Sequence, residues 1–499
     1  MNFNSLQFLI FLPIVVTVYH LLPHKVRWIW LLAASYYFYM SWNALLIFLI
    51  VGTTLVSYGA GLLIEKSQKT GLKRLWLVIT IVVCLGALVF FKYFDFLLGS
   101  VIDFLNLFAM NIKSFSLDLL LPIGISFYTF QTLSYVIDVY KGKIQAERHL
   151  GYYALFVSFF PQLVAGPIER PADLIPQLKA EHKFNWEDFS CGIRILAVGF
   201  FYKCVVADVL GIYVNRVFGN SDGANGLAVL VAGYLFVTQM YCDFAGYSEI
   251  ATGAARLMGI KLSVNFYRPY LSQSYADFFR RWHITLTRWF TDYVYIPLGG
   301  NRKGLPRRIL NTFIVFALCG LWHGANWTYV CWGLYAALFM SIETLIKRPI
   351  GGLLRKMGIN TASKTIWVLR IIGTFMILIP AGIIFRADSL TQAGQMLGTL
   401  FSSWNIFSGN YFAAFIACTG ITFFAAFQML ISMVCEIKLW HYSEIGRHKK
   451  DDLLVYGEEL KYEQSRRTVV SVYTVIAIML CWIALLSTGD ASQFQYFQF

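Results

Sequence analysis

Long, uninterrupted apolar segments constrain the fold of this chain more than any other feature. The first covers residues 6–22, before the first charged residue, Lys25, and later ones include residues 189–214 and 226–250. A helix needs about 20 mainly apolar residues to cross the ~30 Å hydrocarbon core of a bilayer. Charged residues make up 14% of the 499, against about 25% in soluble domains. Transmembrane barrels instead show alternating segments of ~10 residues. The chain is therefore predicted to be an all-α polytopic membrane protein embedded in a lipid bilayer.

The charges between these segments predict how the chain crosses the membrane. Lys and Arg are enriched in the cytoplasmic loops of membrane proteins. Basic loops at residues 25–27, 66–74 and 141–148 alternate with loops that are poor in basic residues, which places the N-terminus outside. Ten spans and two hairpins result. When the legs of the longer hairpin are counted as spans, this gives about twelve transmembrane helices, together with re-entrant helices.

The two hairpins are predicted where apolar segments are broken by helix-disfavouring residues. Residues 152–168 are short and contain Pro161, and residues 309–346 are interrupted near His323 and flanked by basic residues at both ends. Broken backbone is tolerated at membrane depth only inside protein or beside a cavity. His323 lies 15 residues beyond Arg308, or roughly 22 Å along a helix. This histidine is therefore predicted to lie deep in the membrane, near the tip of the second hairpin.

Residues 256–308 are the most basic part of the chain, with ten Lys or Arg against Asp277 and Asp292. One interpretation is a simple cytoplasmic anchor. The other is an attraction site for an anionic ligand such as a nucleotide-like thioester or an acidic lipid. Within this region Arg280 and Arg281 are candidates to hold a pyrophosphate or a lipid headgroup, or simply to extend to the membrane interface. No nucleic-acid partner is expected.

Two histidines and one carboxylate are the main candidates for chemistry. Ionisable residues inside a membrane are costly and are functional candidates by default. His323 precedes a predicted helix break, and a neutral imidazole is the usual general base near pH 7. His283 lies in the basic region and is predicted to be shallower. Each histidine has an alternative interpretation as a hydrogen-bonded structural residue. Asp243 lies in an apolar span and needs a partner, either an arginine or a histidine that it orients.

Several other chemistries have no sequence support. The chain has no GxSxG serine motif, and no Walker A, GxGxxG or HExxH motif. The nine cysteines lie in or beside apolar runs, without CxxC or Cys/His metal spacing, and are predicted to be buried apolar side chains. No metal is therefore expected.

Taken together, these segments resemble the membrane-bound O-acyltransferase (MBOAT) superfamily, and especially the bacterial branch that contains the membrane subunit of alginate O-acetyltransferase. The resemblance covers roughly residues 1–400. The stretches that carry it are Leu121 to Gln131, Phe159 to Ile168, Tyr241 to Glu249, Phe278 to Gly304 and Leu321 to Trp327.

This resemblance implies a central tunnel in which a cytoplasmic donor, acetyl-CoA, meets an acceptor. His323 matches the catalytic histidine of the family, and His283 matches the second histidine of its motif. Many relatives carry a further histidine where this chain has Ala336, so that residue has no counterpart here. The family also implies an extracellular or periplasmic acetyltransferase partner that completes transfer to a polysaccharide. The predicted substrate-binding residues are Arg280, Arg281, Trp282, Asp243 and Asn326.

The predicted organisation is a single membrane-embedded acyltransferase domain over residues 1–499. It has an MBOAT-like core at about 100–400 and additional C-terminal helices at 401–499, where spans are expected at 411–435 and 469–486. The predicted activity is O-acetylation of an exported or cell-wall polysaccharide. One alternative is a D-alanyl transferase for teichoic acid, which the motif from Gly299 to Arg302 and the C-terminal spans disfavour. Another is a proton-coupled transporter with buried histidines as relays.

Overall fold

The computed structural model describes residues 1–402, apart from residues 114, 118 and 120. Within this part every regular element is a helix. Seven helical segments of the described chain are long and apolar enough to cross a membrane: Ala44–Lys66, Thr70–Asn106, Trp186–Phe218, Gly226–Arg256, Gly304–His323, Trp327–Lys347 and Lys364–Arg386. The prediction of an all-α polytopic membrane protein is thereby confirmed.

Some predictions concern residues that the structure does not describe. The expected spans at 411–435 and 469–486 and the C-terminal helices at 401–499 lie outside the described residues, except for residues 401 and 402 at the end of α17. The total of about twelve transmembrane helices and the central tunnel therefore stay predictions.

The described chain divides into two compact units, which are treated separately below. Among the described residues, the N-terminal unit comprises residues 1–196 and 250–263, and the C-terminal unit comprises residues 197–249 and 264–402. The helices that begin in the N-terminal unit are α1 (Leu6–Leu21), α2 (His24–Met40), α3 (Ile47–Lys66), α4 (Thr70–Leu88), α5 (Phe94–Asn106), α6 (Ile125–Tyr140), α7 (Leu150–Ser158), α8 (Pro171–Lys179) and α9 (Trp186–Phe200).

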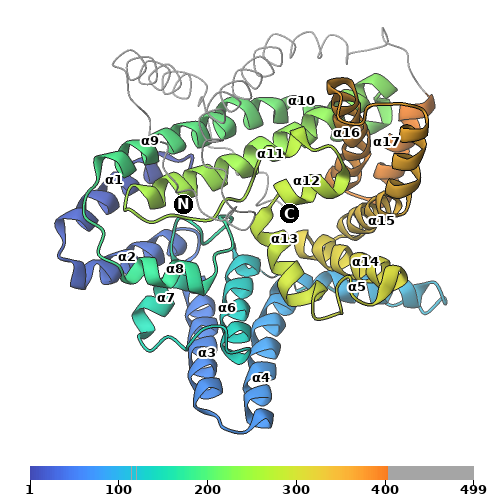
Figure 1. The fold of residues 1–499 in the computed structure, drawn as a ribbon. Helices are drawn as coiled ribbons and strands as arrows, with labels where there is room; N and C mark the ends of the chain where they lie inside the picture. Colours follow the sequence, from blue (N-terminus) through green and yellow to red (C-terminus); the bar gives the residue numbers. More distant parts are fainter. Residues whose placement is uncertain (114, 118, 120, 403–499) are drawn as a thin grey trace, which may run out of the picture. The chain divides into compact units, whose positions relative to one another are not determined.

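Within the N-terminal unit, α3, α4 and α6 pack side by side (Figure 1). The first predicted hairpin also lies here. Its helix, α7, ends at Ser158, and the non-helical chain at residues 159–168 is buried, as broken backbone at membrane depth requires. The next residue, Glu169, is 1% exposed. Its carboxylate accepts hydrogen bonds from the backbone N–H and the hydroxyl of Ser263, at 2.6 and 2.9 Å.

The C-terminal unit contains the elements that carry the candidate site. These are the π-helical turn η3 (Phe201–Ala207), α10 (Asp208–Phe218), α11 (Gly226–Arg256), α12 (Tyr275–Arg281), α13 (Ile284–Phe290), the π-helical turn η6 (Thr291–Tyr295), α14 (Gly304–His323), α15 (Trp327–Lys356), α16 (Lys364–Arg386) and α17 (Leu390–Ser402). The last turns of α11 belong to the N-terminal unit.

The second predicted hairpin is formed by α14 and α15, which pack against each other (Figure 1). Two glycines allow their backbones to approach closely. A Cβ on Gly320 would lie 2.2 Å from the Tyr329 carbonyl oxygen, and one on Gly333 would lie 2.1 Å from the Phe316 carbonyl oxygen. Helix α14 ends at His323, so this histidine lies at the tip of the hairpin, as predicted.

Candidate active site

His283 lies at a sharp break between two short helices of the C-terminal unit. Helix α12 ends at Arg281 and α13 begins at Ile284. The backbone of His283 is left-handed, with φ 44° and ψ 55°, a conformation that few residues other than glycine adopt. A continuous helix would have placed Phe279 and His283 on one face, but the chain turns between them. Backbone strain of this kind is concentrated at functional sites.

Two backbone hydrogen bonds hold the chain preceding α12 against this break. The N–H of Tyr267 donates to the Arg281 carbonyl at 2.8 Å, and the N–H of Ile284 donates to the Asn265 carbonyl at 2.9 Å. The side chain of Asn265 thereby lies beside the imidazole, with its Oδ1 3.1 Å from Nδ1 of His283.

The His283 imidazole is enclosed and electrically neutral at neutral pH. Its side chain is 1% exposed, and its ring lies edge-on to Phe244 and Trp322, with centroids 4.6 and 5.7 Å apart. Burial lowers the pKa of His283 well below its usual 6.5, and the charge of His323 lowers it further. A neutral imidazole keeps one nitrogen lone pair available as a base or a hydrogen-bond acceptor.

His323 lies in the same aromatic surroundings. Its ring contacts Trp322, Trp332 and Phe385, with centroid distances of 5.1, 5.1 and 5.3 Å. Trp322 contacts both histidine rings, and a positive charge on His323 would lower the pKa of His283. The structure therefore places the two predicted histidines on either side of one aromatic ring, that of Trp322.

The three motif residues before His283 differ in their surroundings. Arg280 is exposed at the end of α12. Arg281 is half-buried, and its Nε donates to Asp277 Oδ1 at 3.1 Å, an i,i+4 ion pair within α12. Trp282 stacks on Phe278, with ring centroids 5.2 Å apart. Of the two arginines, Arg280 is the more accessible to an anionic ligand.

Asp243 pairs with a lysine, whereas the sequence analysis had offered an arginine or a histidine. Its Oδ1 accepts a hydrogen bond from Lys203 Nζ at 2.8 Å, and both side chains are 1% exposed. The same ammonium group lies 2.7 Å from Oδ1 of Asp208, which is 29% exposed. Lys203 sits in the π-helical turn η3, and such turns occur frequently at functional sites.

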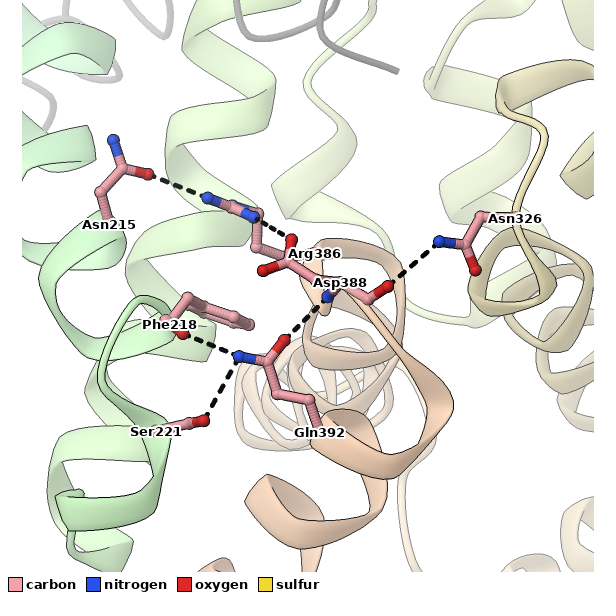
Figure 2. A network of polar contacts seen from close by, with 7 residues as sticks. All are labelled: Asn215, Phe218, Ser221, Asn326, Arg386, Asp388 and Gln392. Atoms are coloured by element: carbon pink, nitrogen blue, oxygen red, sulfur yellow. Dashed lines mark hydrogen bonds and ion pairs between the residues drawn. The ribbon is translucent and has the colours of Figure 1, made fainter. Parts of the chain in front are cut away.

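Asn326 holds the tip of the α14–α15 hairpin. Its Oδ1 accepts from the N–H of Thr328 at 3.0 Å and so caps α15, while its Nδ2 donates to the Asp388 carbonyl at 3.1 Å. Figure 2 shows the network beyond this contact, in which Gln392 accepts from the Asp388 N–H and Arg386 donates to Asn215. In this arrangement both ends of the Asn326 amide bind protein groups.

Sequence reasoning missed two residues of this region. Lys203 is a cation within an apolar span, a signal that was visible in the sequence. Asn265 gave a weaker signal, because it is a single polar residue between Val264 and Phe266. Its importance follows from the turn that places it beside His283. Among the described residues, no group of three His, Cys, Asp or Glu side chains is arranged to hold a metal.

Comparisons with known proteins agree on one family. The profile of the membrane-bound O-acyltransferase family matches residues 144–385. A Pseudomonas syringae pv. tomato protein described as "Probable alginate O-acetylase" is 39% identical over 405 residues, which are 81% of this chain and 75% of that protein. A peptidoglycan O-acetyltransferase of Helicobacter pylori is 34% identical over 74% of this chain and 72% of its own length. A teichoic acid D-alanyltransferase of Bacillus subtilis is 30% identical over 45% of this chain and 60% of its own length.

Proposed function

The chain belongs to the membrane-bound O-acyltransferase family, and we propose that it moves an acetyl group from cytoplasmic acetyl-CoA across the membrane for O-acetylation of an exported or cell-wall polysaccharide. It is thus a multi-pass membrane O-acyltransferase. The choice of acetyl group and polymer is supported by similarity to the alginate and peptidoglycan acetyl-transferring proteins, which cover more of the chain than the D-alanyltransferase does.

The observation that carries this proposal is that the buried His283 and the half-buried His323 both contact Trp322 in an aromatic part of the C-terminal unit. In the proposed reaction, the acceptor hydroxyl oxygen attacks the thioester carbonyl carbon, so that a C–O bond forms and the C–S bond breaks. The hydroxyl proton passes to the imidazole of His323, which acts as the base, and then to the departing thiolate. A positioned base of this kind contributes about 10²–10⁴-fold to a reaction rate.

The donor is proposed to reach the site from the cytoplasmic side, where the basic region at residues 256–308 would attract the polyanionic coenzyme. Arg280 is exposed at the end of α12, so we assign it the first contact with a phosphate of the donor. The other proposed substrate-binding residues are Arg281, Trp282, Asp243 and Asn326, whose contacts within the protein fix their positions.

The acceptor side is proposed to involve an extracellular or periplasmic acetyltransferase partner that completes transfer to the polymer. This proposal is consistent with an N-terminus that lies outside, an orientation supported by the alternation of basic loops.

A second candidate is transfer of D-alanine to teichoic acid, which is favoured only by the partial similarity to the Bacillus subtilis protein. The donor would then be a carrier-protein thioester. A proton-coupled transporter is disfavoured by membership in an acyltransferase family.

The test uses full-length protein in nanodiscs with radiolabelled acetyl-CoA, comparing wild type with His323→Ala. We expect wild type to hydrolyse or transfer the label and His323→Ala to lose this activity while keeping its expression level and thermal stability. His283→Ala serves as the matched second variant. Activity in His323→Ala equal to wild type would refute the assigned role of His323. Turnover only with a D-alanyl carrier protein would replace the acetyl donor by the alternative.

A further inference from the structure

Asn265 receives hydrogen bonds that determine which of its amide atoms is the oxygen. Its side chain is 3% exposed. Oδ1 lies 3.4 Å from the backbone nitrogen of Thr285 and 2.9 Å from the Thr285 hydroxyl, while Nδ2 lies 3.3 Å from the hydroxyl of Ser248. A backbone N–H can only donate. The amide atom that faces it must therefore be the oxygen, which can only accept.

The same oxygen lies 3.1 Å from Nδ1 of His283. Because a carbonyl oxygen carries no proton, Nδ1 must supply one. A neutral imidazole has a single N–H, so a proton on Nδ1 leaves a lone pair on Nε2. The hydrogen bond made by one ring nitrogen thus determines what the other can do.

We propose that Asn265 is a positioning residue that holds the proton of His283 on Nδ1, so that His283 takes part in the transfer as a hydrogen-bond acceptor at Nε2. This inference rests on the proposed acyl transfer and assigns His283 a specific role in that reaction. At Nε2 His283 accepts a hydrogen bond, from the attacking hydroxyl or from an N–H of His323. It does not donate to the thioester carbonyl oxygen, and the negative charge that develops there is stabilised by other groups.

The surroundings of His283 support a fixed neutral tautomer. The rings that pack on it, Phe244, Phe266 and Trp322, do not ionise in the working pH range. The ionisable group that acts on it is His323, whose positive charge would oppose a second proton on the ring and lower its pKa. Burial acts in the same direction. Both effects favour the neutral ring, and Asn265 selects its tautomer.

The first test measures the tautomer directly and does not depend on activity. Full-length protein labelled with ¹⁵N-histidine is examined by NMR in nanodiscs, and the His283 signals are identified by their loss in His283→Gln. We expect a protonated Nδ1 and an unprotonated Nε2 in wild type. A proton on Nε2 in wild type would overturn the proposal, whether or not the protein transfers acetyl groups.

The second test compares variants of the same network by acetyl transfer. Asn265→Ala should lower kcat by at least about tenfold and leave the KM for acetyl-CoA unchanged, since a wrong histidine tautomer can cost up to about 10⁴ in kcat. Thr285→Val and Ser248→Ala are matched controls. Each removes one hydroxyl from Asn265 and leaves the contact with His283 in place, so each should keep kcat within about threefold of wild type.

Asn265→Asp distinguishes positioning from a merely structural role. Aspartate keeps an acceptor oxygen at Nδ1, so kcat should recover above that of Asn265→Ala. Its negative charge should also raise the pKa of His283 and move the acid limb of the pH–rate profile to higher pH. An Asn265→Ala variant no slower than Thr285→Val, or an Asn265→Asp variant without recovery or pH shift, would refute the proposal. Absence of transfer by wild type with any donor would instead refute the proposed function.

Discussion

Replacing Lys203 by methionine should destabilise the protein by about 3–5 kcal/mol, the usual cost of removing one partner of a buried ion pair. Its Nζ lies 2.8 Å from Asp243 and 2.7 Å from Asp208, inside the apolar segment Trp186–Phe218. Lys203 and Asp243 are both 1% exposed. Without the ammonium group, Asp243 would remain as an uncompensated charge that water does not reach.

The two carboxylates should contribute unequally. Asp243→Asn keeps a group that can hydrogen-bond to Lys203 and leaves Asp208 to balance its charge, so we expect a loss of about 1–3 kcal/mol. Asp208 is 29% exposed, and Asp208→Asn should cost no more than about 1 kcal/mol, as for exposed pairs. The double variant Lys203→Met/Asp243→Asn should be more stable than Lys203→Met alone, because the stranded charge is removed.

The assay is denaturant unfolding of the purified full-length protein in detergent micelles, with acetyl transfer measured on the same samples. Equal, small losses of stability in Lys203→Met and Asp208→Asn would refute a buried pair. The same data test the predicted role of Asp243 in substrate binding. A changed substrate KM in Asp243→Asn at unchanged stability would show that this carboxylate acts on substrate and not on the ion pair.

Three further predictions concern other residues. Burial raises the pKa of Glu169 from 4.5 to about 7, so the folded protein holds a proton that the unfolded chain has lost. Stability should therefore fall by up to about 3 kcal/mol as pH rises from 4.5 through 7, and Glu169→Gln should remove this dependence in unfolding measured across that range. Arg280→Ala and Arg281→Ala should each raise the KM for acetyl-CoA in transfer kinetics, and unchanged values would leave both as lipid anchors. Asn326→Ala should cost about 1 kcal/mol in unfolding through loss of the α15 cap, and a stability equal to wild type would show that this cap contributes nothing.

Hydropathy predicted the helices well where length alone decides the structure. The expected spans at residues 189–214 and 226–250 correspond to Trp186–Phe218 and Gly226–Arg256. In lipid the backbone must satisfy its own hydrogen bonds, so a long apolar run has few options other than a helix. Local helix-breaking residues similarly predicted the tip of the second hairpin, because Gly324 follows His323 directly and ends α14.

Partners across the fold were harder to predict than the elements themselves. The need of Asp243 for a partner followed from the cost of a buried charge, but the choice of Lys203 depends on which helices pack together. The packing of these helices depends on tertiary contacts such as that at Gly246, where an added Cβ would lie 2.9 Å from the Gly199 carbonyl oxygen and 3.1 Å from the backbone nitrogen of Lys203. Periodicity within one helix carries no information about such contacts.

The geometry at His283 could not be predicted for a related reason. A continuous helix over residues 275–290 would have aligned His283 with Phe279. Instead, the left-handed backbone of His283 itself interrupts the helix. Holding a non-glycine residue there costs about 1–3 kcal/mol. Two backbone hydrogen bonds, from Tyr267 and Ile284, offset this cost by tying the preceding chain to the break on both sides. The same two bonds place Asn265 against the imidazole, so the strain at His283 and the orientation of its ring nitrogens have a single structural origin. A variant that relaxed the turn would therefore release the tautomer as well.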